Sequence, residues 1–186
     1  KWSLGRFKIG LSNADINKNK FSVIYQTVNK PRINFKKKKN LISFIGKLNR
    51  AKGYDIFGEA IVKILDKYPN WKSFIIGDEP REKHFFYHKN LIQFGYKNHK
   101  FILKKLEETS ISVICSTWNE PLGRASLEAC SRGSVPIITN KGGLPETSSA
   151  AIIIKNLNVK NLVKEIEKLI LNRKLLNKLQ VKNYKE

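Results

Sequence analysis

The stretch SISVICSTWNEPLGRASLEACSRGSVPIITNKGGLPE, residues 110–146, decides the fold of this chain. It holds two short apolar runs, at 111–115 and 135–139, with a segment of helical spacing between them at 122–131. Runs that are apolar throughout indicate strands covered on both faces, and a helix that joins two such strands predicts a parallel pair.

The same alternation of strand and helix continues on both sides of this stretch. The expected strands are 40–46, 71–77, 91–95, 111–115, 135–139 and 151–154, with a further short strand at 21–25. The expected helices are 54–68, 81–89, 97–108, 122–131, 159–171 and a last one from about 173. We therefore expect an α/β fold with a doubly wound, Rossmann-like parallel sheet of about six strands.

The charge of the chain is strongly positive. Its 186 residues carry a formal net charge of +21, and only seven of the 36 basic residues are arginine. Such a surface attracts nucleic acid, anionic lipid headgroups or phosphorylated ligands. We interpret most of the excess as solvated charge, and the lysine run 36–39 as a solvated linker, because nucleic-acid-binding proteins concentrate arginine. An anionic membrane surface is the alternative partner for this run.

The residues that bind metals or form disulfides are few. Cys115 and Cys130 are too few for a disulfide framework and fit no metal motif, so we expect buried, reduced thiols. His84 and His88 are four residues apart on an expected helix, but no third ligand accompanies them, so we expect no metal. No apolar run approaches the roughly 18–20 residues of a membrane span.

The chemistry is expected at the carboxyl ends of the strands, where doubly wound sheets bind their ligands. After the first strand, Gly46 is followed by Lys47 and Lys52, and a helix starts just beyond. Two lysines and the positive end of a helix suit a diphosphate. The spacing is neither a P-loop nor GxGxxG, which disfavours an ATPase or a dinucleotide oxidoreductase. The alternative is two surface lysines in a loop.

A second anion site is expected after the fourth strand. Pro121 fits the first turn of a helix. The free amides of Leu122, Gly123 and Arg124 would then point into the same cleft.

Two glutamates flank this helix start. Glu128 would lie about 12 Å along the axis from Glu120 and about 80° around it, so both carboxylates could face one elongated ligand. Glu128 has apolar neighbours and needs a hydrogen-bonding partner, for which the vicinal hydroxyls of a sugar are suitable. A capping Glu120 and a salt-bridged Glu128 are the alternative. After the fifth strand, Gly142 and Gly143 form a turn that permits close approach of a ligand.

The ordered set of motifs resembles the C-terminal donor-binding domain of the GT-B glycosyltransferases of family 4, retaining enzymes that use nucleotide-sugar donors. The matching motifs are FIGKL at 44–48 with KG at 52–53, IIGD at 75–78, QFG at 93–95, EPLGR at 120–124 with EA at 128–129, and GGLPE at 142–146. The resemblance covers residues 40–172. It departs from the family at Glu79, which stands where a second glycine is frequent, and at Lys47, where arginine is usual.

The resemblance implies catalytic roles for three residues. Lys47 and Lys52 would neutralise the diphosphate of the donor, and Glu120 would contact the transferred sugar. Cleavage of the sugar–phosphate bond builds negative charge on the leaving diphosphate, which fixed cations and amides stabilise. No metal ion or other cofactor is therefore expected.

The remaining matched residues would bind the donor. Leu122, Gly123 and Arg124 would hold the distal phosphate through their amides, and Glu128 would bind the ribose hydroxyls. Gly95 and Tyr96 would contact the nucleobase. The other donor-binding glycines are Gly46, Gly77, Gly142 and Gly143.

The resemblance also implies what the chain is part of. Residues 1–39 would connect to an N-terminal domain that carries most of the acceptor site, 40–172 would form the nucleotide-sugar-binding domain, and 173–186 a shortened terminal helix. The implied activity is transfer of a sugar, from UDP by family frequency, to a glycan or lipid-linked acceptor with retention. The chain would be inactive alone, and cytoplasmic or peripheral at the inner face of the cell membrane. The alternatives are a non-catalytic nucleotide-sugar-binding module and a basic nucleic-acid-binding protein.

Overall fold

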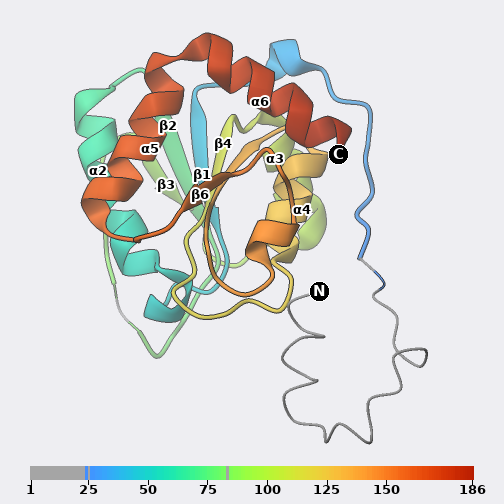
Figure 1. Cartoon of the computed structure of the whole chain (residues 1–186). Coiled ribbons are helices and arrows are strands. Elements are labelled where there is room, and N and C mark those ends of the chain that lie inside the picture. The colour runs from blue at the N-terminus through green and yellow to red at the C-terminus, as the bar shows by residue number, and fades with distance from the viewer. Residues whose placement is uncertain (1–23, 25, 83) are drawn as a thin grey trace, which may run out of the picture.

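A single parallel sheet forms the centre of the molecule (Figure 1). The computed structural model describes residues 24, 26–82 and 84–186. The strands are β1 (Leu41–Ile45), β2 (Lys72–Ile76), β3 (Leu91–Gln93), β4 (Ile111–Ile114), β5 (Val135–Thr139) and β6 (Ile152–Ile154). They lie in the order β3-β2-β1-β4-β5-β6, and every neighbouring pair is parallel. The expected doubly wound, Rossmann-like α/β fold is confirmed.

Helices cover both faces of this sheet. The α-helices are α2 (Tyr54–Lys67), α3 (His99–Glu108), α4 (Arg124–Ser131), α5 (Val159–Leu171) and α6 (Arg173–Lys185). Short 3₁₀ helices are η3 (Phe35–Lys37), η4 (Arg50–Lys52) and η5 (Leu144–Glu146). Figure 1 shows α2 and α5 on one side of the sheet and α3 and α4 on the other. Because both faces are covered, all five residues of β5 are buried.

The strand order determines where a ligand can bind. From β1 the chain moves outward through β2 to β3, then crosses back to β4 and moves outward in the other direction. The carboxyl ends of β1 and β4 therefore flank the point at which the winding reverses. In open α/β sheets this point opens a crevice for ligands.

The helix expected at 81–89 does not form, and this prediction was wrong. Its described residues are extended or in turns, and their exposure alternates: Phe85 and Tyr87 are 64% and 80% exposed, whereas Phe86 is turned inward. The ring of Phe86 packs edge-on against Tyr54 at 5.5 Å between centroids. It also lies over Gly58, where a Cβ would come within 2.1 Å of the ring. This contact with α2 holds the segment extended, so His84 and His88 do not share a helical face.

The lysine run 36–39 is solvated at three of its four positions, as expected, but it is fastened to the fold and is not a loose linker. The side chain of Asn34 caps η3, and the ring of Phe35 meets that of Tyr184 on α6 at 5.5 Å. Lys38 is buried, and its ammonium donates to three carbonyls at the ends of α3 and α4. The prediction that residues 1–39 connect two domains is a separate matter and stays a prediction.

Other expectations concern burial and the ends of the chain. Both cysteines are free and buried, as expected, and burial raises the pKa of each thiol to about 12. The last helix is α6, whose Leu176 lies in the main core. Of the strand expected at 21–25, only Ile24 is among the described residues. No helix in the described part of the chain is long and apolar enough to cross a membrane.

Candidate functional site

A cavity of about 220 Å³ lies where the winding of the sheet reverses, at the carboxyl ends of β1 and β4. Its wall consists of Phe44, Ile45, Gly46, Lys52, Val113, Ile114, Ser116, Glu120, Gly123, Arg124 and Ala125. The structure thus brings together five of the residues that the sequence indicates, from the loops after two different strands.

Lys52 reaches this cavity because η4 is held against the end of β4. The side chain of Asn49 caps η4 and accepts a hydrogen bond from the Lys52 amide at 3.0 Å. Gly53 follows in the left-handed conformation with φ 71°, and a Cβ there would lie 2.2 Å from the carbonyl oxygen of Cys115. Only glycine permits this approach. The close contact brings the Lys52 side chain to the β4 loop.

Glu120 forms an ion pair with Lys52 in the cavity wall. Its Oε1 accepts hydrogen bonds from Lys52 Nζ and, at 2.6 Å, from Ser116 Oγ. Burial acts to raise the pKa of Glu120, but the hydrogen bonds from Lys52 and Ser116 outweigh it, so the pKa is lowered. The carboxylate is therefore ionised at neutral pH. Lys52 Nζ also lies 5.8 Å from the ring centre of Trp118, which is half exposed.

The helix after Glu120 begins later than the sequence indicates. It starts at Arg124, so Pro121 and Leu122 precede it, and the expectation of Pro121 in the first helical turn was wrong. The carbonyl of Glu120 accepts a hydrogen bond from the Gly143 amide at 2.6 Å. This bond keeps the residues between Glu120 and Arg124 in a loop.

The amides at the start of α4 are nevertheless directed at the cavity region. Gly123 caps the helix in the left-handed conformation with φ 92°, and no side chain of the described residues bonds to the cap. The first amides of an α-helix lack partners within the helix. Gly123, Arg124 and Ala125 all line the cavity, whereas Leu122 does not. The candidate anion site is therefore shifted along the chain from the predicted one.

Gly142 and Gly143 lie behind the Glu120 loop and not in the cavity wall. A Cβ on Gly142 would come within 2.1 Å of the Glu120 carbonyl oxygen, and one on Gly143 within 2.4 Å of that of Pro121. The Gly-Gly turn thus supports the loop that carries Glu120.

Glu128 is buried beside the cavity, at 7% exposure. Its Oε1 accepts a hydrogen bond from Arg124 Nε at 3.0 Å and lies 2.9 Å from His99 Nε2. It lines a small adjoining hollow that shares Ile45 and Ala125 with the main cavity. The helical angle expected between Glu120 and Glu128 does not apply, because Glu120 precedes the helix.

His99 and Ser116 contact the two glutamates, and neither residue was predicted from the sequence. His99 begins α3, and only the packing of α3 against α4 brings it to Glu128. Ser116 lies two residues after the end of β4, so its position near a strand end was the one available signal.

The remaining candidates lie outside the cavity wall. A Cβ on Gly77 would lie 1.8 Å from the Gly46 carbonyl oxygen, so Gly77 permits close packing of the β1 and β2 ends. Gly95 has φ 64° with open space around it, and Tyr96 is 75% exposed. Lys47, which follows Gly46 in the sequence, is exposed and does not line the cavity.

Glu79, which departs from the family pattern, turns toward Arg81. It accepts hydrogen bonds from Arg81 Nε at 2.7 Å and Nη2 at 2.9 Å. These bonds lower the pKa of Glu79 to about 2.

The site combines two kinds of group. An ammonium and the amides of a helix start can bind phosphate oxygens, and two carboxyl groups can accept hydrogen bonds from hydroxyls. Together they suit a ligand that carries both phosphates and sugars.

Comparison with known proteins agrees with this chemistry. Residues 26–186 match the family model described as glycosyl transferases group 1. Among curated proteins, YtcC of Bacillus subtilis (strain 168), named as a candidate glycosyltransferase, is 26% identical over 158 residues. The alignment covers 76% of this chain and 39% of YtcC, so the chain spans about two fifths of that relative.

Solved structures show the same fold. The C-terminal domain of the glycosyl transferase group 1 family protein LpcC from Francisella tularensis has a TM-score of 0.70 and 24% identity, covering 81% of this chain and 86% of that domain. Anabaena HepE in complex with UDP-glucose has a TM-score of 0.68 and 16% identity, covering 78% of this chain and 43% of HepE. At these identities the likeness shows the fold alone.

Proposed function

The chain belongs to the glycosyl transferases group 1 family, and we propose that it is the donor-binding half of a GT-B enzyme that transfers a sugar from a nucleoside-diphosphate sugar. One observation carries the proposal. Lys52, Glu120 and the first amides of α4 line the same cavity at the reversal point of the sheet. That set supplies a cation, a carboxylate and free donors within reach of one ligand.

The phosphate-binding groups would lower the barrier of the reaction. The bond between the anomeric carbon and the phosphate oxygen breaks, and its electron pair stays on the leaving diphosphate. Lys52 and the amides of Arg124 and Ala125 would stabilise this growing charge. The acceptor hydroxyl forms the new bond to the anomeric carbon and passes its proton to an oxygen of the leaving diphosphate. We propose, with the family, that the configuration at this carbon is retained.

Glu120 would bind the transferred sugar. It is held by Lys52 and Ser116 through one oxygen, Oε1. A sugar hydroxyl can donate to its carboxylate once the diphosphate draws Lys52 toward the phosphates. Before the donor binds, the ion pair would keep the side chains of Lys52 and Glu120 in position.

Glu128 would bind the ribose. Arg124 and His99 both contact its Oε1, and no hydrogen bond within the described residues involves Oε2. An ionised carboxylate can accept several hydrogen bonds, so Oε2 is free for the vicinal hydroxyls of a ribose.

The finer assignments rest on the family resemblance. A UDP-sugar is the proposed donor, which the UDP-glucose bound to the similarly folded HepE supports. A glycan or lipid-linked glycan is the proposed acceptor, with the enzyme in the cytoplasm or at the inner membrane surface. We propose that cations and amides of the chain take the place of a metal ion.

The test is a thermal-shift screen of nucleoside diphosphates and their sugars, followed by calorimetry. The proposal expects saturable binding of at least one nucleoside diphosphate, and a raised unfolding temperature in its presence. Binding should weaken in Glu128→Ala while the variant keeps its circular dichroism spectrum. If no nucleoside diphosphate binds to the folded chain, the proposal is wrong.

A further inference from the structure

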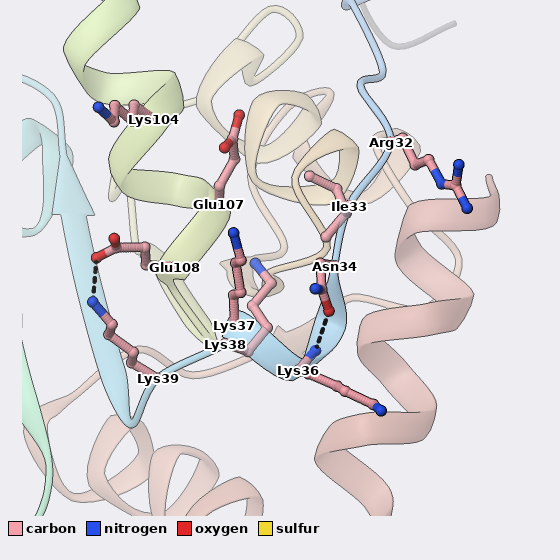
Figure 2. A pocket seen from close by; sticks show the side chains of 10 residues that line it. All are labelled: Arg32, Ile33, Asn34, Lys36, Lys37, Lys38, Lys39, Lys104, Glu107 and Glu108. Atoms are coloured by element: carbon pink, nitrogen blue, oxygen red, sulfur yellow. Dashed lines mark hydrogen bonds and ion pairs between the residues drawn. The ribbon is translucent and has the colours of Figure 1, made fainter.

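A second hollow lies at the opposite edge of the sheet from the candidate site. It has a volume of about 520 Å³ and lies beside η3 and the end of α3, which lead into β1 and β4 (Figure 2). Its wall consists of Arg32, Ile33, Asn34, Lys36, Lys37, Lys38, Lys39, Lys104, Glu107 and Glu108. Since parallel strands begin at one edge and end at the other, this hollow is separate from the candidate donor site.

Two of the basic side chains in the wall have partners within the chain. Lys38 Nζ donates to the carbonyls of Leu106 at 3.0 Å, Thr109 at 2.7 Å and Arg132 at 2.5 Å. Lys39 pairs with Glu108 at 3.0 Å, as the dashed line in Figure 2 shows. These contacts fasten η3 to the ends of α3 and α4, and they fix the floor of the hollow.

The other four basic side chains have no such partners. Arg32, Lys36, Lys37 and Lys104 are exposed, and none forms an ion pair with any described residue. They come from three segments of the chain and line one hollow. In Figure 2, Arg32 and Lys104 lie on opposite sides of it. Six basic side chains against two carboxylates leave a formal excess of four positive charges. Like charges in one wall repel one another, and an anion bound in the hollow would reduce that repulsion.

We infer that the hollow is a binding site for a phosphate group, carried by a lipid headgroup or free in solution. Lysine ammonium groups bind phosphate as compact point charges. Three of the four free cations are lysines, two of them on η3, which the Lys38 contacts hold in place. Burial lowers the pKa of Lys38 to about 7, against the opposing effect of Glu107, and a bound anion would raise it again.

The composition of the hollow argues against a nucleic acid as the partner. Single-stranded nucleic acids are bound largely by stacking of bases on aromatic rings. No aromatic side chain lines this hollow, and its single apolar side chain is Ile33. Clusters of lysine without apolar anchors are instead typical of electrostatic attachment to anionic lipids.

The test compares two triple variants of equal charge in the full chain. Lys36→Gln/Lys37→Gln/Lys104→Gln removes three cations from the hollow. Lys63→Gln/Lys160→Gln/Lys164→Gln removes three exposed lysines from α2 and α5, on the other side of the sheet. Binding is measured by co-sedimentation with vesicles of phosphatidylcholine and phosphatidylglycerol, and by titration of amide NMR signals of residues 34–39 and 104–108 with inorganic phosphate.

We expect the triple variant at Lys36, Lys37 and Lys104, called the hollow variant, to lose at least about tenfold in affinity for vesicles or phosphate. The control variant should lose about twofold or less. Vesicle binding with this difference identifies a lipid headgroup as the source. A phosphate response without vesicle binding identifies a soluble phosphate. Equal losses in both variants overturn the inference, because the effect would then belong to the net charge. The absence of both vesicle binding and a phosphate response overturns it as well. Nucleoside diphosphate binding should survive in the hollow variant, which separates this test from that of the proposed function.

Discussion

At the level of single residues, the most informative contact is the ion pair between Lys52 and Glu120. Lys52 ends η4 and Glu120 lies in a loop, and the two are 68 positions apart in the sequence. Gly53 and Gly142 let their loops approach, because no side chain fits between backbone and backbone at either position. The chemistry of the site therefore depends on residues that do no chemistry themselves.

Lys52 and Lys47 should differ in their effect on binding. Lys52 lines the cavity, whereas Lys47 is exposed and lies outside the wall. We expect Lys52→Ala to weaken nucleoside diphosphate binding about tenfold to hundredfold, as loss of a charged hydrogen bond does. Lys47→Ala should cost about threefold or less. Calorimetry on both variants measures this, and a larger loss in Lys47→Ala would contradict the geometry.

The pKa of Glu120 should depend on Ser116. Because its pKa is lowered in the folded chain, the contribution of Glu120 to stability is fully present above its unfolded pKa of about 4.3. That contribution is lost as pH falls through the folded value. Ser116→Ala removes one hydrogen bond, so the pKa of Glu120 should rise toward its ordinary value. Carboxyl ¹³C NMR over pH 2–7 records it, and an unchanged pKa would refute the assignment.

Gly142 and Gly95 form a matched pair for testing close approach. Both have left-handed φ, 60° and 64°, but only Gly142 faces another backbone, since nothing lies within 4 Å of a Cβ on Gly95. Gly95→Ala should cost about 1–2 kcal/mol from conformation alone. Gly142→Ala should cost about 1–3 kcal/mol more, because the Glu120 loop must move. Urea unfolding gives both values, and equal costs would show that the contact is unimportant.

At the level of elements, tertiary contacts override local pattern in two places. Residues 81–89 have enough apolar positions for a helix, yet the described ones form none, and Phe86 packs instead on Gly58 and Tyr54. The helix at 122–131 loses its first two residues because the Gly143 amide binds the Glu120 carbonyl. In both places the deciding partner is distant in sequence.

The contact between Gly58 and Phe86 predicts that Gly58→Ala changes the free energy of unfolding in the direction opposite to the usual one. Alanine is normally better than glycine inside a helix by about 1 kcal/mol. In the otherwise unchanged chain, Gly58→Ala should destabilise, because the new Cβ meets the Phe86 ring. In a Phe86→Ala background the same substitution should stabilise by about 1 kcal/mol. A double-mutant cycle by urea unfolding tests this. Stabilisation of similar size in both backgrounds would show that the ring moves aside freely.

At the level of the whole molecule, the two edges of the sheet differ in chemistry. The carboxyl edge holds the cavity with Lys52, Glu120 and the start of α4, and the amino edge holds the lysine-lined hollow. In the proposed enzyme, the carboxyl edge would bind the donor and the amino edge would bind a phosphate group.

The activity of the whole protein should require a second domain. The chain spans 39% of YtcC, and the family resemblance assigns most of the acceptor site to an N-terminal domain. We expect this chain alone to bind nucleoside diphosphate without transferring sugar, and transfer to return on mixing with an N-terminal domain of the same enzyme. Release of UDP from a UDP-sugar with acceptor present is the measurement. Binding that persists without any restored transfer would favour a non-catalytic nucleotide-sugar-binding module.

The positions of the six strands along the chain and their parallel, doubly wound arrangement followed from local sequence. Apolar runs that end in glycine or a small residue, with helices between them, allow few arrangements other than a doubly wound sheet, because connections are short and right-handed. The positions of Gly46, Lys52, Glu120 and Gly123 near one edge follow from that arrangement. So does the general location of the candidate site.

Contacts between distant segments settled the rest. His99 meets Glu128, Gly142 meets Glu120, and Lys38 meets three helix-end carbonyls only after the helices pack. Each contact joins segments at least 22 residues apart, so neither periodicity nor propensity carries a signal for it. Local patterns determine most of the elements that form, whereas the direction of a loop side chain depends on the steric and hydrogen-bonding demands of neighbours from elsewhere in the chain.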